Sequence, residues 1–255
     1  MSKMIITGSR GFIGTAVRKT LRNCPYTEID SKVFTDYREL KGKTGTLIHL
    51  AASINERESF SDPIKYIDNN ISGLALLLKN NNFNKVIFPS SITVYDNTGN
   101  LNPETVYGMT KLAGEQLIKI YAKKYWILRI TNPFGPNDVN SVFARLKHCK
   151  LNGETFQIYN NPNALKDFFH VDHVASVIQK IIDGRIKPGI YNVGSGRGTV
   201  VVDMLKSLCE KFSIEYELID PPVGISSGYI PTESLLTQDY MEVEIEWVKY
   251  LGGNV

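Results

Sequence analysis

A tyrosine and a lysine four residues apart are the side chains of this sequence best suited to proton transfer. Tyr107 and Lys111 share one face of a predicted helix that begins near Tyr107. A phenol has an ordinary pKa of about 10, but a neighbouring ammonium and an oxidised nicotinamide ring both favour the phenolate. Tyr107 is therefore a candidate acid/base that exchanges a proton with a substrate hydroxyl while hydride moves to or from a nicotinamide.

Ser91 is the third member of this candidate catalytic set. It ends the strand-like run KVIFPSS, and open α/β sheets bind their ligands at the carboxyl ends of their strands. From there its hydroxyl can hydrogen-bond the oxygen of the reacting carbon. Ser91, Tyr107 and Lys111 together suit redox chemistry between an alcohol and a carbonyl.

A glycine-rich turn predicts the dinucleotide site that such chemistry needs. TGSRGFIG places Gly8, Gly11 and Gly14 between the first predicted strand and the first predicted helix. Free backbone N–H groups and the positive end of the helix dipole make such a turn an anion site. We expect the turn, with Arg10, Phe12 and Ile13, to hold a pyrophosphate.

The choice of dinucleotide depends on one acidic residue. Asp30 ends the next strand-like run, YTEID, sixteen residues after Gly14, near the offset of about 20 residues at which an acid holds the adenosine ribose. Asp30 therefore favours NAD. Lys32 would instead meet a 2′-phosphate, which leaves NADP as the alternative.

The segments that must position these residues alternate between strand and helix. MIITG, TLIHLAA, KVIFPSS and WILRI are short aliphatic runs, and helical-period stretches such as FIGTAVRKTLRNC and YGMTKLAGEQLIKIYAKK separate them. This order predicts an α/β fold with a Rossmann-type, doubly wound parallel sheet.

The second half of the chain predicts a smaller lobe. Gly and Pro interrupt shorter elements after about Thr131, whereas DFFHVDHVASVIQKIIDG and GIYNVGS read as a helix followed by a strand. We expect residues 1–130 to form the dinucleotide domain, rejoined by about 168–194. Residues 131–167 and 195–255 would form a smaller substrate-binding lobe.

Composition points to a small-molecule partner. The 255 residues carry 29 basic and 26 acidic side chains, mixed along the chain, for a net charge of +3, so no tract predicts nucleic acid or a membrane. Three cysteines without CxxC spacing argue against disulfides and zinc. We expect no metal, no signal peptide or membrane span, and a cytoplasmic protein.

Several ordered motifs resemble those of one family. The chain is similar to the extended short-chain dehydrogenase/reductase superfamily, and within it to the NAD-dependent nucleotide-sugar epimerase/dehydratase family. The matching segments are TGSRGFIG (7–14), LIHLAA (47–52), NISG (70–73), SSITVY (90–95), YGMTK (107–111), LRITNPFGP (128–136), DFFHVDHVA (167–175) and YNVGSG (191–196).

The resemblance implies a larger set of ligand contacts. Ser91, Tyr107 and Lys111 are its catalytic residues. The implied cofactor-binding residues are Gly8, Arg10, Gly11, Phe12, Ile13, Gly14, Asp30, Leu50, Ala51, Ala52, Asn70, Ser90, Tyr107, Lys111, Pro133 and Phe134. The implied substrate-binding residues are Ser53, Ser91, Thr93, Tyr107, Asn132 and Lys166. In related enzymes the helix after Tyr107 joins two subunits, which implies a homodimer.

Departures from the family pattern narrow the expected reaction. Ile92 and Thr93 stand where dehydratases carry an Asp-Glu pair, so dehydration is disfavoured. No arginine follows Arg197, although family members place a diphosphate-binding arginine in that region. We expect an NAD(P)-dependent nucleotide-sugar epimerase. The alternatives are an NAD(P)H-dependent 4-keto-sugar reductase of the dTDP-4-dehydrorhamnose type and a non-catalytic dinucleotide sensor.

Overall fold

Six parallel strands form the centre of the protein. The computed structural model describes residues 3–29, 41–221, 228–231, 233–235 and 240–252. The strand order is β10-β5-β4-β3-β1-β2. The bounds are β1 (Met4–Thr7), β2 (Tyr26–Ile29), β3 (Thr44–His49), β4 (Asn82–Ser91), β5 (Lys124–Ile130) and β10 (Gly189–Val193). The order reverses after β1, as in a doubly wound sheet.

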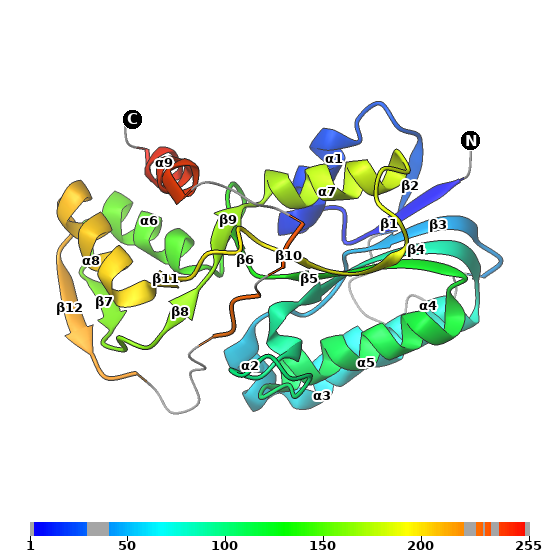
Figure 1. The fold of residues 1–255 in the computed structure, drawn as a ribbon, viewed down its shortest axis with the longest axis horizontal. Coiled ribbons are helices and arrows are strands. Elements are labelled where there is room, and N and C mark those ends of the chain that lie inside the picture. The colour runs from blue at the N-terminus through cyan, green and yellow to red at the C-terminus, as the bar shows by residue number, and fades with distance from the viewer. Residues whose placement is uncertain (1–2, 30–40, 222–227, 232, 236–239, 253–255) are drawn as a thin grey trace.

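Helices cover both faces of this sheet, as Figure 1 shows. On one face lie α1 (Phe12–Thr20) and α7 (Asp172–Ile182), which share a buried core with Ile6, Ile48 and Leu128. On the other lie α4 (Gly73–Lys79) and α5 (Val106–Tyr121), whose core includes Ile5 and Leu47. Adjacent residues of β1 and β3 thus point to opposite cores, which is why Ile5 and Ile6, and likewise Leu47 and Ile48, are consecutive apolar residues.

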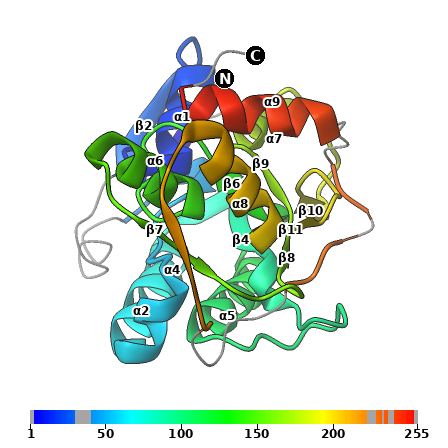
Figure 2. The same cartoon turned by 90° about the vertical axis from the view of Figure 1, so that its left-hand side faces the viewer.

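A second group of elements, on the left in Figure 1 and toward the viewer in Figure 2, has a separate core. Its strands are β6 (Asn132–Phe134), β7 (Phe156–Tyr159), β8 (Leu165–Lys166), β9 (Phe168–His170), β11 (Thr199–Val200) and β12 (Tyr216–Ile219). Its helices are α6 (Val142–Asn152), α8 (Val201–Phe212) and α9 (Tyr240–Tyr250). We call this group the smaller lobe.

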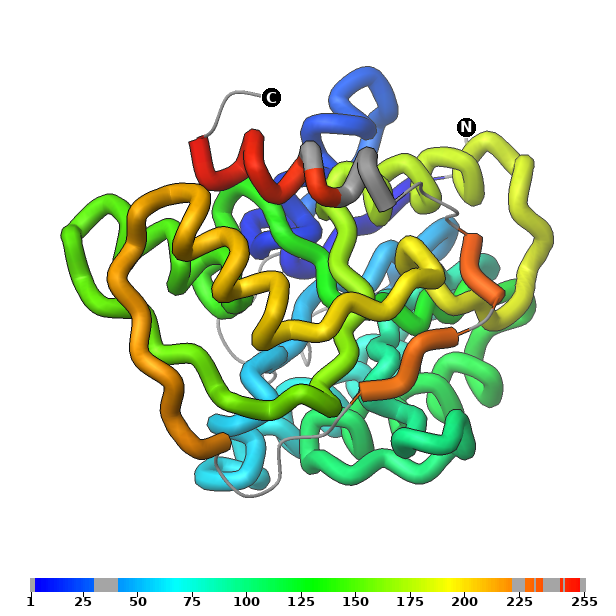
Figure 3. Tube along the Cα trace, turned by 60° about the vertical axis from the view of Figure 1, so that its left-hand side comes forward, coloured from blue at the N-terminus to red at the C-terminus, as the bar shows by residue number. Residues whose placement is uncertain are grey.

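The chain passes between the two groups more than once. After α6 and β7 of the smaller lobe it returns to the sheet through α7 and β10, and then α8 and β12 lie in the smaller lobe again (Figure 3). The strand at Gly189–Val193 pairs in parallel with β5 at the sheet edge.

One segment differs from its predicted structure. Residues Phe168–His170, which read as part of a helix, form strand β9 and pair with β6. The helix α7 begins only at Asp172. Phe168 and Phe169 are buried on opposite sides of the short strand, in the smaller-lobe core and the sheet core respectively. Extended backbone is what lets adjacent aromatic residues enter two different cores.

No helix in the described ranges combines the length and apolarity that crossing a membrane requires.

Candidate active site

The predicted cofactor residues follow the carboxyl ends of the neighbouring strands β1 and β3. Thr7 at the end of β1 lies opposite His49 at the end of β3. The Leu50 nitrogen donates to the Thr7 carbonyl at 3.1 Å, and the Ala51 nitrogen donates to the Thr7 hydroxyl at 3.3 Å. These bonds place the predicted cofactor residues Leu50, Ala51 and Ala52 directly beside the glycine turn.

The turn itself requires glycine at two positions. Gly8 has a φ of +67°, and a Cβ there would lie 2.6 Å from the Ala51 nitrogen. A Cβ on Gly14 would lie 2.2 Å from the Gly8 carbonyl oxygen. The turn is therefore packed backbone against backbone, which no other residue type permits.

The N-terminus of α1 opens from this turn with its backbone groups uncapped. Gly11 is the N-cap residue, no side chain caps the helix, and no acidic residue lies in the first turn. Such an end presents N–H donors and a positive dipole to an anion. Arg10 is exposed, and Phe12 and Ile13 pack partly against the sheet core. Asp30, the predicted ribose ligand, and Lys32 lie outside the described residues.

Asn70 has a different surrounding from the other predicted cofactor residues. It lies in a π-helical turn (Asp68–Ser72) before α4 and is buried. Its amide accepts from the Ser53 nitrogen at 2.8 Å and donates to the Ser53 carbonyl and the Thr110 hydroxyl. Asn69 donates to the Ser53 hydroxyl at 2.9 Å. Asn70 thus ties the segment after β3 to α5, and its side chain is already engaged by the protein.

The structure brings the three predicted catalytic residues together. Tyr107 is buried in the first turn of α5, with its phenol near enough to Ser91 for that side chain to act on the phenol pKa. Ser91 also accepts from the Thr93 hydroxyl at 2.9 Å. The Lys111 ammonium lies 5.9 Å from the centre of the Tyr107 ring and donates to the Pro89 carbonyl at 2.8 Å. This is the arrangement that proton exchange with a substrate oxygen requires.

The protonation states of this set are governed by burial. Burial raises the pKa of Tyr107 above its ordinary value, the negative charge of Glu56 raises it further, and the Ser91 hydroxyl opposes the rise. Burial lowers the pKa of Lys111 to about 8, against a small opposing effect of Glu115. Desolvation of the phenolate is therefore the largest effect on the pKa of Tyr107, and it opposes the lowering that we expect from the Lys111 ammonium.

A buried histidine beside Lys111 was not anticipated as a site residue. His49 is 2% exposed, shares a 2.8 Å hydrogen bond with Thr7 and stacks on Phe88. Burial, assisted by the positive charge of Lys111, lowers its pKa to about 3. His49 is therefore neutral at physiological pH and leaves Lys111 as the cation of the set.

Ser90 points into a buried polar network. Its hydroxyl donates to Glu115 at 2.7 Å, and Arg129 holds the same carboxylate through two bonds of 2.9 and 2.6 Å. Arg129 also donates to the Tyr95 hydroxyl at 2.5 Å. This network joins α5 to β4 and β5 close to the catalytic residues, since Ser90 directly precedes Ser91 and Glu115 lies one turn after Lys111.

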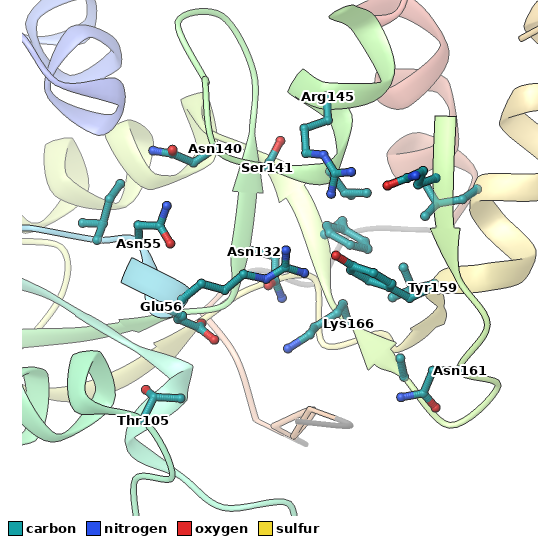
Figure 4. Close-up of a pocket in the computed structure, with 18 of the residues that line it drawn as sticks. Asn55, Glu56, Thr105, Asn132, Asn140, Ser141, Arg145, Tyr159, Asn161 and Lys166 are labelled. Atoms are coloured by element: carbon teal, nitrogen blue, oxygen red, sulfur yellow. The ribbon is translucent and has the colours of Figure 1, made fainter. Parts of the chain in front are cut away.

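A cavity of about 580 Å³ lies between the catalytic helix and the smaller lobe. Thr105, which caps α5 two residues before Tyr107, lines it together with the predicted substrate residues Asn132 and Lys166. Figure 4 shows Lys166 directed into this space. The N-cap of the catalytic helix and two of the six predicted substrate residues therefore border the cavity, whereas Ser53, Ser91, Thr93 and Tyr107 are not among its lining residues.

Four further lining residues were missed by sequence reasoning: Arg57, Arg145, Tyr159 and Glu56. The Arg57 guanidinium lies 5.0 Å from the centre of the Tyr159 ring, and Arg145 extends toward the cavity in Figure 4. With Lys166, these arginines give the cavity three cations. Their positions are scattered along the sequence, so no local pattern indicated them.

The remaining predicted contacts are placed as follows. Asn132 donates its amide to the Asp167 carbonyl at 3.1 Å, and Pro133 is partly buried. Phe134 is fully buried and packs against Phe143 in the smaller lobe, so its ring faces protein. In the part of the chain that the structure describes, no cluster of three or more His, Cys, Asp or Glu side chains suits a metal.

Curated relatives share this sequence at low identity. The chain is 24% identical over 210 residues to the trifunctional UDP-glucose 4,6-dehydratase/UDP-4-keto-6-deoxy-D-glucose 3,5-epimerase/UDP-4-keto-L-rhamnose-reductase RHM2 of Arabidopsis thaliana, covering 74% of this chain and 32% of that protein. It thus spans about a third of that relative. It is 25% identical to the UDP-glucose 4-epimerase of Bacillus subtilis, covering 87% of this chain and 86% of that enzyme.

Solved structures and a family model agree on the fold. MoeE5 in complex with UDP-glucuronic acid and NAD superposes with a TM-score of 0.81 at 22% identity, covering 97% of this chain and 99% of that one. Residues 4–194 match the model of the NAD dependent epimerase/dehydratase family. The glycine turn and the uncapped α1 fit NAD, the cofactor of that family. The chain belongs to the NAD dependent epimerase/dehydratase family, of the extended short-chain dehydrogenase/reductase type.

Proposed function

We propose that this protein is an NAD-dependent nucleotide-sugar epimerase that oxidises a sugar hydroxyl transiently to a ketone. The observation that carries the proposal is the grouping of Ser91, Tyr107 and Lys111 beside a cavity with three cations. A protein that only senses a dinucleotide has no need of this grouping. The names of the relatives, which include UDP-glucose 4-epimerases, support the same reaction class.

NAD would be held by the glycine turn and the N-terminus of α1, and when bound it accepts and returns hydride. Tyr107 takes the proton of the sugar hydroxyl as the ketone forms and gives it back when the alcohol is restored. Ser91, which lies near the phenol, would turn its single hydroxyl hydrogen to the same sugar oxygen. Lys111 supplies positive charge next to the phenol, which favours the phenolate.

The cavity suits a substrate with a diphosphate. Arg57, Arg145 and Lys166 come from α2 (Glu56–Ser61), α6 and β8 and line one space. Guanidinium groups match phosphate oxygens in geometry and charge. These three cations could bind a diphosphate in place of the arginine that the sequence lacks after Arg197, which supports a nucleotide-linked sugar.

Dehydration and keto-sugar reduction are the two reactions related to epimerisation. Ile92, which is buried, and Thr93 follow Ser91, and neither side chain can serve as an acid/base pair for loss of water. A keto-sugar reductase is the second candidate, because the activities named for the Arabidopsis relative include a UDP-4-keto-L-rhamnose reductase. A reductase consumes its reduced cofactor, whereas an epimerase regenerates the oxidised form in place.

The first test is mass spectrometry of the small molecules that the purified protein releases on denaturation. We expect near-stoichiometric NAD, because an epimerase has no need to exchange its cofactor. An empty protein that binds NADH or NADPH reversibly would favour the reductase. A panel of UDP- and dTDP-sugars, assayed for conversion with the cofactor-loaded protein, then identifies the substrate.

A substitution tests the catalytic role. We expect Tyr107→Phe to lower turnover by at least about 10³-fold while NAD stays bound. Tyr121→Phe is the matched control, because Tyr121 ends the same helix and is 46% exposed, so its turnover should equal that of the unaltered protein. Unchanged turnover in Tyr107→Phe would refute the assignment.

Three further predictions are part of this proposal. The division into a dinucleotide domain and a substrate-binding lobe is supported by the separate cores. A homodimer through α5 is supported by the exposed side chains of Met109 and Ile120 on that helix, and sedimentation equilibrium tests it. The cytoplasmic location follows from the cysteine content, and fractionation of cells that express the protein tests it.

A further inference from the structure

Glu56 is held in a fixed relation to the catalytic helix. It is the first residue of α2, and the buried Ser59 hydroxyl donates to its carbonyl at 2.5 Å. The same hydroxyl accepts from the Tyr107 nitrogen at 3.2 Å. One serine therefore links the backbone of Glu56 to the backbone of the catalytic tyrosine, and the Glu56 charge raises the pKa of the Tyr107 phenol.

The Glu56 carboxylate is directed into the cavity. Figure 4 shows it near Thr105, with Lys166 on the other side of the space. Within the described ranges its carboxylate has neither a hydrogen bond nor an ion pair with the protein. Glu58, two residues further along α2, differs because Lys65 and Tyr66 donate to it at 2.5 and 2.9 Å.

The cavity is therefore lined by side chains of both charges. Arg57, Arg145 and Lys166 are its cations, while Glu56, whose backbone Ser59 links to that of Tyr107, lines it with a carboxylate. A diphosphate at the cations would leave its sugar ring toward Tyr107, where the ring must lie to react. A carboxylate there accepts hydrogen bonds from sugar hydroxyls and repels a second carboxylate.

We propose that Glu56 is a specificity-determining residue that selects a sugar ring bearing hydroxyl groups and rejects a uronic acid. This inference rests on the proposed function, because it takes a nucleotide-linked sugar as the ligand of the cavity. The selection works through a repulsive element, which is a common way to separate two ligands of similar shape.

The test compares two sugar nucleotides that differ only in the ring substituent. Binding of UDP-glucose and UDP-glucuronate to the NAD-loaded protein is measured by calorimetry, with UDP alone as the reference. If the protein converts dTDP-sugars and not UDP-sugars in the substrate assay, the corresponding dTDP-sugars replace this pair. We expect UDP-glucuronate to bind at least about tenfold more weakly than UDP-glucose, because Glu56 is only partly buried and solvent screens part of the repulsion.

Two variants separate a local effect from a change in net charge. Glu56→Gln keeps the shape of the side chain and removes its charge, so we expect UDP-glucuronate to gain about tenfold relative to UDP-glucose. Glu104→Gln is the matched control, because Glu104 is exposed next to Thr105 and does not line the cavity. We expect this control to leave the ratio of the two affinities unchanged.

The outcomes distinguish the inference from the function on which it rests. If UDP-glucose binds but Glu56→Gln leaves the ratio unchanged, or Glu104→Gln changes it equally, the role of Glu56 is refuted and the proposed function stands. If neither nucleotide alone nor any sugar nucleotide binds the NAD-loaded protein, the proposed function fails and the inference fails with it.

Discussion

Lys111→Met tests whether the catalytic lysine is kept at a cost to stability. Lys111 is 6% exposed, and burial lowers its pKa from 10.5 to about 8. That lowering corresponds to about 3 kcal/mol for carrying the charge inside the protein at neutral pH. Methionine fills a similar volume without charge, but it leaves the Pro89 carbonyl without the 2.8 Å bond, a loss of about 1–3 kcal/mol.

The two effects predict that the variant is no less stable than the unaltered protein at pH 7, and up to about 2 kcal/mol more stable. The pH dependence has a definite sign. The native pKa of Lys111 lies below that of the unfolded chain, so between about pH 8 and 10.5 the unfolded chain binds more protons and the stability of the unaltered protein rises with pH. Its stability relative to the variant should therefore increase over this range.

Urea unfolding of both cofactor-free proteins at several pH values measures this difference, and subtraction removes the titration of other groups. Turnover should be lost in the variant at every pH, because Lys111 supplies the charge beside Tyr107. A variant that is more than about 2 kcal/mol less stable at pH 7, with a difference that does not change with pH, would show that the lysine stabilises the fold and that desolvation is not the dominant effect.

Three more changes have definite expected outcomes. Gly14→Ala should lower the free energy of unfolding by about 1–3 kcal/mol and weaken NAD binding, because the added Cβ would lie 2.2 Å from the Gly8 carbonyl oxygen. Urea unfolding measures the first effect and calorimetry the second. Normal NAD binding would contradict the packing argument. Arg129→Met should cost about 3–5 kcal/mol of unfolding free energy because it leaves the fully buried Glu115 charge unpaired, and replacing Glu115 by leucine in the same protein should recover part of it. Burial raises the pKa of Tyr107, so an ultraviolet titration compared with Tyr107→Phe should show no phenolate from this residue at pH 10 without NAD. NAD should move the titration of Tyr107 to lower pH, because the positive nicotinamide favours the phenolate. A titration that NAD leaves in place would contradict the proposed acid/base role.

The fold and the local motifs were predictable because each depends on residues close in sequence. Alternating runs identified a parallel sheet, and the structure has one. Parallel strands bring their carboxyl ends to one edge, which is why Ser91 at the end of β4 meets Tyr107 on the next helix. For the same reason the glycine turn after β1 lies beside Ala51 after β3.

The cavity was less predictable because long-range packing creates it. Arg57, Arg145 and Lys166 lie on three elements of which two belong to the smaller lobe, and their spacing carries no periodic signal. The acid/base state of Tyr107 could not be read from the Tyr-Lys spacing either. The spacing gives the favourable charge, but only the packed structure gives the burial that opposes it.

Polar side chains hold the catalytic helix α5 in place at three successive turns. This role accounts for buried polar residues on a helix that packs against a sheet, where apolar residues would otherwise be expected. Ser59 accepts from the Tyr107 nitrogen in the first turn, Asn70 donates to the Thr110 hydroxyl in the second, and Glu115 binds Ser90 and Arg129 in the third. Each buried polar group costs stability unless it is fully paired. An acid/base reaction requires the phenol to be positioned within fractions of an ångström, and these pairs supply that restraint from three separate parts of the chain.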